Sequence, residues 1–204
     1  MKAMDNYMRT IGIWSSVATM LIAALSPLTV YGAGQDGVTT PPAAEKLGIG
    51  GGYFTCVTPE GWQRVDNDPD HGDKKIYMIE FNGPRIEGAP IMILVSYYGA
   101  GNRDFNDYKD FVVRNTTNVM DEVLAVAEKT AVNGYDALTF EREEKTFLHP
   151  KSKDDTAVMI KEKFYVILGR DRKGFFVLNY YAPTSVYADN LPVFEKVAGS
   201  FKVS

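Results

Sequence analysis

Strand-like patterns fill the chain from Tyr53 onward. A short apolar run, YFTCV (53–57), leads into a predicted turn at PEGW, and the run KIYMIEF (75–81) ends at a second predicted turn, NGP (82–84). The next run, PIMILVSYY (90–98), holds five consecutive apolar residues. Because a strand that is apolar on both sides is normally covered on both faces, the pattern predicts a sheet buried between two layers.

Two segments change to helical spacing. In the first, Asp104 is placed to cap a helix in FNDYKDFVVRNTTNVM (105–120), whose apolar residues recur along one stripe. The second opens at Thr184 or Ser185, and it contains Pro192, which a helix tolerates only near its first turn. Each apolar stripe predicts a helix that packs on a sheet.

Turn residues between these two helices predict hairpins. Asn133-Gly134 lies between alternating runs, and both central residues of a type I′ turn need a positive φ, which this pair adopts readily. A further pair of strands is predicted on either side of GRDRKG (169–174). The predicted order is several antiparallel strands, a helix, four antiparallel strands and a helix. We therefore expect an α+β fold with a largely antiparallel β-sheet sandwiched by helices.

The N-terminal residues predict export. Lys2 and Arg9 precede an uncharged apolar run that ends in small residues, so residues 1–32 have the layout of a secretory signal peptide. An uncleaved anchor is the alternative, because residues 11–30 are just long enough to span a bilayer. Cleavage would leave a periplasmic or secreted protein with no membrane span.

A linker is predicted between the signal segment and the folded domain. Residues 33–52 are rich in Gly, Pro and Ala and contain almost nothing to bury, which is typical of a flexible tether. The folded domain is then expected over residues 53–204.

Composition and charge narrow the function classes. The 204 residues carry a formal net charge of −4 without a basic run, so a nucleic-acid partner is not expected. The single cysteine, Cys56, excludes an intrachain disulfide and a cysteine-based metal cluster. Because Cys56 lies in an apolar strand pattern, we expect it to be buried and unreactive.

A loop rich in aspartate is the one candidate metal site. Its carboxylates are Asp66, Asp68, Asp70 and Asp73. The first three occupy the opening ligand positions of a calcium loop, but His71 stands where glycine belongs and Tyr77 stands where a bidentate glutamate should close the site. An acidic surface turn is therefore favoured over a weak calcium site, and no other cofactor is expected.

Residues for other chemistry are few. His71 and His149 lie in polar turns and no G-x-S-x-G elbow is present, so a hydrolase would need a triad assembled across the fold. Asn115 opens the glycosylation pattern NTT.

Two tyrosine pairs, Tyr97-Tyr98 and Tyr180-Tyr181, stand in predicted strands. Neighbouring strand residues point to opposite faces, so one tyrosine of each pair is expected under a helix and the other outward or at an edge. Packing in the core is favoured over a role in a contact surface.

The order of elements and several quoted stretches resemble the PsbP-like family. These stretches are PEGW (59–62), NGYDALTFERE (133–143) and FFVLNYYAP…YADNLPVFEKVAGSF (175–201), and the resemblance covers about Tyr53 to Val203. The family is named after an extrinsic lumenal protein of photosystem II, and small bacterial exported proteins and a Ran-binding import factor share its fold. The resemblance implies an α/β/α sandwich, an exported location (the thylakoid lumen in a photosynthetic organism) and a non-enzymatic role at a membrane complex.

We therefore expect an exported, non-enzymatic binding or accessory protein that supports a membrane or envelope protein complex. Its partner would be a protein in the exported compartment. The alternatives are a weak divalent-cation binder that uses the 66–73 loop, and a small exported hydrolase.

Overall fold

The computed structural model describes residues 47–48, 52–67, 75–118, 123–148, 157–169 and 174–204. The chain divides into two units, Met1–Pro41 and Pro42–Ser204, and all of the described residues belong to the second. The predicted signal segment and most of the predicted linker therefore lie outside the described residues.

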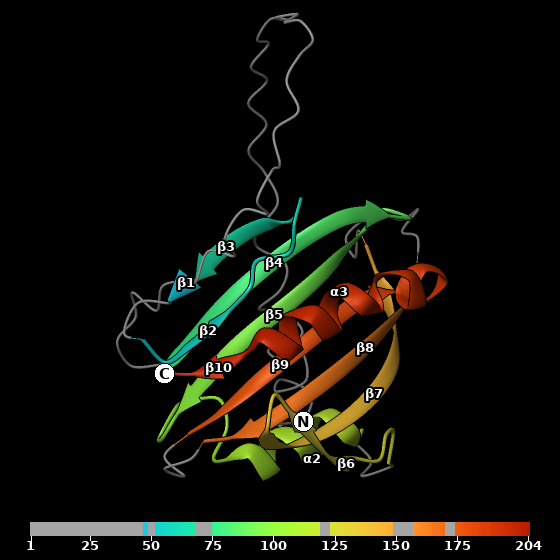
Figure 1. The fold of residues 1–204 in the computed structure, drawn as a ribbon. Coiled ribbons are helices and arrows are strands. Elements are labelled where there is room, and N and C mark those ends of the chain that lie inside the picture. Colours follow the sequence, from blue (N-terminus) through green and yellow to red (C-terminus); the bar gives the residue numbers. More distant parts are fainter. Residues whose placement is uncertain (1–46, 49–51, 68–74, 119–122, 149–156, 170–173) are drawn as a thin grey trace, which may run out of the picture. The chain divides into compact units, whose positions relative to one another are not determined.

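The main element is a seven-stranded antiparallel sheet with the strand order β3-β4-β5-β9-β8-β7-β6 (Figure 1). Its strands are β3 (Gln63–Asn67), β4 (Ile76–Ile86), β5 (Ala89–Gly99), β6 (Glu128–Val132), β7 (Tyr135–Phe147), β8 (Ala157–Leu168) and β9 (Gly174–Pro183). A small second sheet has the order β1-β2-β10 and comprises β1 (Leu47–Gly48), β2 (Phe54–Cys56) and β10 (Lys202–Val203).

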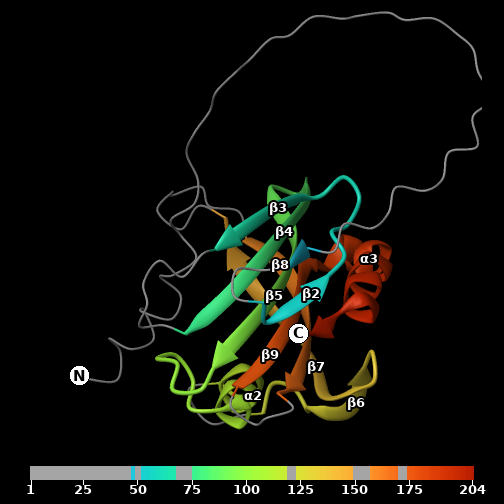
Figure 2. The ribbon, with the colours of Figure 1, turned by 60° about the vertical axis from the view of Figure 1, so that its left-hand side comes forward.

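Both faces of the large sheet are covered. In the central strand β9, Phe176, Leu178 and Tyr180 join the cluster that packs on α3 (Tyr187–Ser200) and β2. The intervening Phe175 and Val177 join the cluster around α2 (Tyr108–Thr116). The two helices therefore lie on opposite faces of the sheet (Figures 1 and 2), and the predicted α+β sandwich is confirmed.

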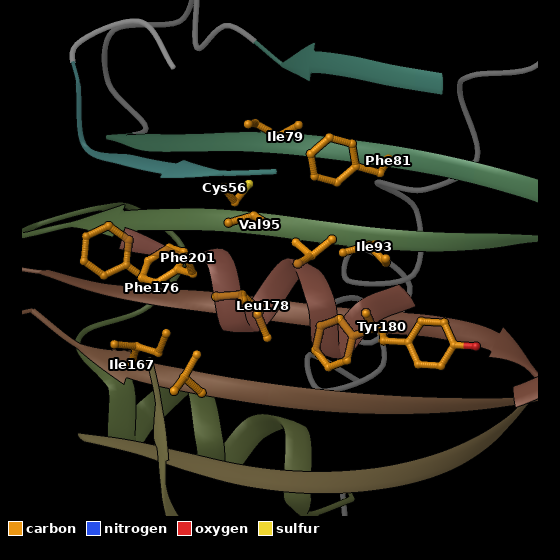
Figure 3. Close-up of a cluster of buried hydrophobic side chains, with 14 of the residues drawn as sticks. Cys56, Ile79, Phe81, Ile93, Val95, Ile167, Phe176, Leu178, Tyr180 and Phe201 are labelled. Atoms are coloured by element: carbon orange, nitrogen blue, oxygen red, sulfur yellow. The ribbon is translucent and has the colours of Figure 1, made fainter. Parts of the chain in front are cut away.

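The larger core lies on the α3 side. Figure 3 shows side chains of this core extending from β4, β5, β9 and β8 of the large sheet and from β2. Side chains with no exposed surface include Ile79, Phe81, Ile93, Val95, Leu178, Tyr180, Phe194 and Phe201. Cys56 of β2 belongs to the same cluster, so the prediction that it is buried is confirmed.

Helix α2 begins later than predicted. Asp107, and not Asp104, is the N-cap, since its carboxylate accepts hydrogen bonds from the amides of Lys109 and Asp110. The side-chain oxygen of Asn102 accepts hydrogen bonds from the amides of Asp104 and Phe105, which holds that stretch in a turn. The predicted cap at Asp104 was therefore wrong.

Helix α3 follows a short 3-10 helix, Thr184–Val186, so the predicted opening at residues 184–185 is confirmed. Pro192 was expected near the first turn but lies in the second turn of α3. Its missing amide costs about 3 kcal/mol in a helix interior. The burial of Tyr187, Phe194 and Val197, at about 2 kcal/mol for each, more than offsets that cost.

The Asn133-Gly134 hairpin is confirmed, with φ values of 46° and 80° between β6 and β7.

The turn predicted at residues 82–84 was wrong. β4 continues through these residues with a register shift between Asn82 and Arg85, and the chain reverses at Glu87-Gly88. Pro84 fits there because the described pairs join β3 only to residues 78–82 of β4.

Two further features lie near the N-terminal end of the described residues. Pro59 accepts a hydrogen bond from the amide of Trp62 and Gly61 has a φ of 76°, so the turn predicted at PEGW is confirmed. β1 pairs with β2 from within the segment 33–52 that was predicted as a linker, so two residues of that segment belong to a sheet.

The packing at the start of β9 gives a testable prediction. A Cβ at Gly174 would lie 2.5 Å from the carbonyl oxygen of Tyr98 and 2.8 Å from the ring of Tyr97. We expect Gly174→Ala to lower the free energy of unfolding by about 3 kcal/mol, because backbone must move to relieve the overlap. Urea denaturation followed by circular dichroism measures this change.

Gly199→Ala is the matched control. Gly199 lies in the last turn of α3, and a Cβ there meets nothing within 4 Å. This change should leave the free energy of unfolding unchanged or raise it by up to about 1 kcal/mol. Equal losses in the two variants would show that the close approach at Gly174 is not what requires glycine.

Candidate functional site

The predicted calcium loop is described only at Asp66. This carboxylate is exposed and accepts a hydrogen bond from Nε of Arg64 at 2.7 Å. Asp68, Asp70 and Asp73 lie outside the described residues. Across the described ranges, no group of three or more histidine, cysteine or acidic side chains is placed to hold a metal ion. The calcium site therefore stays a prediction.

The side chains considered for catalysis do not form a catalytic centre in the part of the chain that the structure describes. His71 and His149 lie outside it. Burial raises the pKa of Cys56 to about 12, with Arg64 acting weakly in the opposite direction. A thiol with so high a pKa is almost entirely protonated at neutral pH, so Cys56 is a poor nucleophile.

The tyrosine pairs are packing residues. Tyr98 contacts Phe105 and Phe111 on the α2 side, with ring centroids 5.3 Å and 5.8 Å away. Tyr97 stacks on Tyr53 at 4.3 Å on the opposite face instead of pointing outward. Tyr180 is fully buried under α3 and donates a hydrogen bond to the carbonyl oxygen of Tyr187.

A group of exposed apolar side chains marks the outer side of α2 and the segment that follows it. The exposed fractions are 56% for Val113, 68% for Val123, 58% for Leu124 and 72% for Val126. We call these four residues the α2 surface. A single exposed apolar side chain is normal in a soluble protein, but several in neighbouring parts of the structure are a feature of interaction sites.

Hydrogen bonds hold the parts of the α2 surface together. Thr117 pairs with Val123 in an isolated bridge, and the amides of Leu124 and Ala125 both donate to the carbonyl oxygen of Thr116, at 2.7 Å and 3.3 Å. Val113 is one turn earlier on the same helix, and its carbonyl oxygen accepts a hydrogen bond from the amide of Thr117. The four side chains therefore belong to one locally ordered structure.

Residues 123–127 expose their larger apolar side chains and pack their smaller ones inward, which is the reverse of the normal arrangement at a core. Ala125 and Ala127 pack against the cluster beneath α2, whereas the larger Leu124 and Val126 point to solvent. Alternation places adjacent side chains of an extended segment on opposite sides, so a one-residue shift would bury the larger pair. The hydrogen bonds to Thr116 fix the register that exposes them.

A buried ion pair lies on the same face of the sheet. Glu162 of β8 is only 5% exposed, and its carboxylate accepts a hydrogen bond from Nε of Arg142 at 2.5 Å. A terminal nitrogen of Arg142 donates to the side-chain oxygen of Asn115 in the last turn of α2, at 3.0 Å. Asn115 in turn donates to the carbonyl oxygen of Phe111 at 2.8 Å. Hydrogen bonds therefore connect Glu162, Arg142 and Asn115.

The folded protein disfavours the ionised form of Glu162. Burial raises the pKa of Glu162, and Arg142 lowers it less strongly, while the nearby Glu144 carboxylate adds to the rise. Because the pKa is higher in the folded than in the unfolded protein, the contribution of Glu162 to stability falls as the pH rises above the ordinary carboxyl pKa.

Asn115 does not present a free glycosylation site in the fold. Both ends of its amide group are hydrogen-bonded, and the residue is partly buried in the last turn of α2.

The opposite face carries partly exposed ion pairs. Glu195 of α3 accepts hydrogen bonds from Lys163, at 2.8 Å, and from the hydroxyl of Tyr165, at 3.0 Å. Lys161 and Glu141 form a second pair at 2.9 Å. These contacts join α3 and two neighbouring strands, and they offer controls for changes on the α2 face.

No family model and no curated protein matches the chain. Solved structures that are similar to it include a crystal structure from Bacteroides thetaiotaomicron, at 10% identity and a TM-score of 0.48 over 79% of this chain. The chain spans about half of that protein, 48% of its length.

Two other similar structures are matched over most of their length. The cyanobacterial PsbP of Synechocystis is 14% identical with a TM-score of 0.47, over 84% of this chain and 98% of that one. The Ran-binding protein Mog1p of Saccharomyces cerevisiae is 16% identical with a TM-score of 0.41, over 79% and 95%.

The solved structures thus include a PsbP, from the family that the sequence resembles. At these identities and TM-scores the similarity carries no argument about function. None of the described helices combines the length and the apolar composition needed to cross a bilayer.

Sequence reasoning missed both features of the α2 face. The stretch from Val123 to Val132 was interpreted as one alternating strand run, although the strand begins at Glu128. A signal was present, because the inward positions of 123–127 are alanines and the outward ones are larger apolar residues. The charges around Arg142 alternate in sign, a pattern typical of a solvated hairpin, so the sequence did not indicate that Arg142 and Glu162 form a buried pair.

The buried pair predicts a strong and pH-dependent effect of Arg142→Met. The variant leaves the Glu162 carboxylate buried without its cation, so we expect the free energy of unfolding to fall by about 3 kcal/mol or more at pH 7.5. Removing Arg142 removes a group that lowers the pKa of Glu162, so the carboxyl group protonates more readily in the variant. The loss should therefore be smaller at pH 5.0, as measured by urea denaturation at both pH values.

Lys161→Met supplies the comparison on the other face. Its ion pair with Glu141 is partly exposed, so its removal should cost no more than about 1 kcal/mol at either pH. If the loss in Arg142→Met did not depend on pH, Glu162 would not be the group that Arg142 compensates.

Proposed function

We propose that the protein is an exported, non-enzymatic binding module that docks on a protein of a membrane or envelope complex through the α2 surface. Export is supported by the signal-peptide pattern of residues 1–32. The docking role is supported by the exposure of Val113, Val123, Leu124 and Val126, which is the observation that carries the proposal.

The exposed arrangement has no explanation in the packing of the domain. Leu124 and Val126 add nothing to the core, while Ala125 and Ala127, which alternate with them, face it. Burying a valine or leucine side chain that was exposed contributes about 1.5–3 kcal/mol. A partner that covers the α2 surface would therefore gain most of its affinity from a few side chains, as interfaces normally do.

The charged residues next to the α2 surface in the sequence favour a protein partner over an anionic bilayer. Asp121 and Glu122 directly precede the exposed residues in sequence, and the exposed Glu128 follows them. The whole chain has a net charge of −4. An anionic lipid surface attracts basic segments, so the complementary partner is an apolar protein surface with a neutral or basic rim.

A binding role also suits the chemical state of the described groups. The Cys56 thiol is buried with a raised pKa, and the Glu162 carboxylate is already bonded to Arg142. Groups held in this way support packing and positioning, in contrast to an accessible nucleophile beside a general base.

The proposal predicts the effect of a charge in the α2 surface. A photoreactive amino acid at Val126, in the native host, should crosslink one defined protein in the exported compartment. With that protein purified, Leu124→Asp should weaken its binding at least about tenfold, because a charge at a buried apolar contact costs more than the lost burial.

Met159→Asp is the matched control, since Met159 is an exposed apolar residue of β8 that lies outside the α2 surface. Both variants should keep the free energy of unfolding within about 0.5 kcal/mol of the parent protein. Equal affinities of the two variants for the crosslinked protein, or no crosslinked product at all, would contradict the proposed docking surface.

A further inference from the structure

We propose that Arg142 is a positioning residue for the α2 surface, which it holds in place by joining the buried Glu162 to Asn115. The inference rests on the proposed function for its binding consequence. The mechanical link itself can be tested without a partner.

The guanidinium group of Arg142 contacts two different elements at once. Nε binds the Glu162 carboxylate of β8 at 2.5 Å, and a terminal nitrogen binds Asn115 of α2 at 3.0 Å. Its central carbon also lies 5.2 Å from the centre of the Phe164 ring, a cation–π distance. Arginine can make these contacts together because its donors form a rigid planar fork.

The link continues from Arg142 to the exposed residues without a gap. Asn115 is the neighbour of Thr116, and the carbonyl oxygen of Thr116 accepts hydrogen bonds from the amides of Leu124 and Ala125. The position of the last turn of α2 therefore sets the position of the segment that carries Leu124 and Val126.

Rigidity matters here because α2 is short. The helix has nine residues, of which Phe111 and Thr116 are buried, while Tyr108 and Val112 pack partly buried on the same cluster as Phe111. A contact surface that is already ordered before binding loses less conformational entropy when a partner covers it. Loss of the link should therefore weaken binding even though none of the three linked residues belongs to the α2 surface.

Amide hydrogen exchange of the unbound protein tests the link. We expect Arg142→Lys and Asn115→Ala to speed exchange at Leu124 and Ala125 about tenfold, the change in local opening expected for the loss of one charge-assisted hydrogen bond. Lysine keeps a positive charge for Glu162 but lacks the fork that reaches Asn115. Exchange in α3 should not change.

Two variants separate positioning from general destabilisation. Asn115→Asp keeps an acceptor oxygen for Arg142 but loses the donor to the carbonyl oxygen of Phe111, so it should return the exchange at Leu124 and Ala125 part of the way to that of the parent protein. Glu195→Gln removes a more exposed ion pair on the other face and should leave both amides unaffected.

Binding of the crosslinked protein completes the test. Arg142→Lys and Asn115→Ala should weaken it about tenfold and Asn115→Asp should restore part of it, in step with the exchange rates. Unchanged exchange at Leu124 and Ala125 in both weakened variants would overturn the link. Faster exchange with unchanged affinity would overturn the positioning role, and failure to find any crosslinked protein would count against the proposed function alone.

Discussion

Burial of both faces of β9 is the constraint on which the rest of the structure depends. Phe176, Leu178 and Tyr180 point to one side of this central strand, and Phe175 and Val177 point to the other. An antiparallel sheet often leaves one face in water, but this sheet cannot do so without exposing aromatic rings. Two separate covers are therefore required, one for each face.

The two covers differ in size, and the unusual residues Glu162 and Leu124 both lie on the side of the smaller one. The α3 side is closed by a helix of 14 residues together with β2, and its centre is almost wholly apolar. The α2 side is closed by a helix of nine residues and the extended segment after it. The buried Glu162 of β8 lies beneath this smaller cover, and the exposed Leu124 belongs to it.

Sequence patterns predicted the fold well because it depends on periodicity and on turn chemistry. The apolar run of β5, the Asn133-Gly134 turn and the stripe around Phe194 each act locally, so one sequence was enough to place them. The start of α2 and the turn at residues 82–84 were mispredicted because contacts decide them. Asn102 accepts hydrogen bonds from the amides of Asp104 and Phe105, and β4 stays paired with β5 as far as Ile86. The candidate site failed for the same reason, since the partners Arg142 and Glu162 are 20 residues apart and meet only across the β7–β8 register.

The ion pair of Glu162 and Arg142 and the α2 surface are best explained together, because both are connected to the last turn of α2. Replacing a buried ion pair by apolar residues is often neutral or stabilising, so stability alone does not explain Glu162 and Arg142. Exposed leucine and valine likewise add nothing to the core. Natural proteins break such rules mainly where function requires it. Both departures converge on one short helix, through Asn115 from below and through Thr116 from the side, and this convergence favours α2 over any other described element as the working surface.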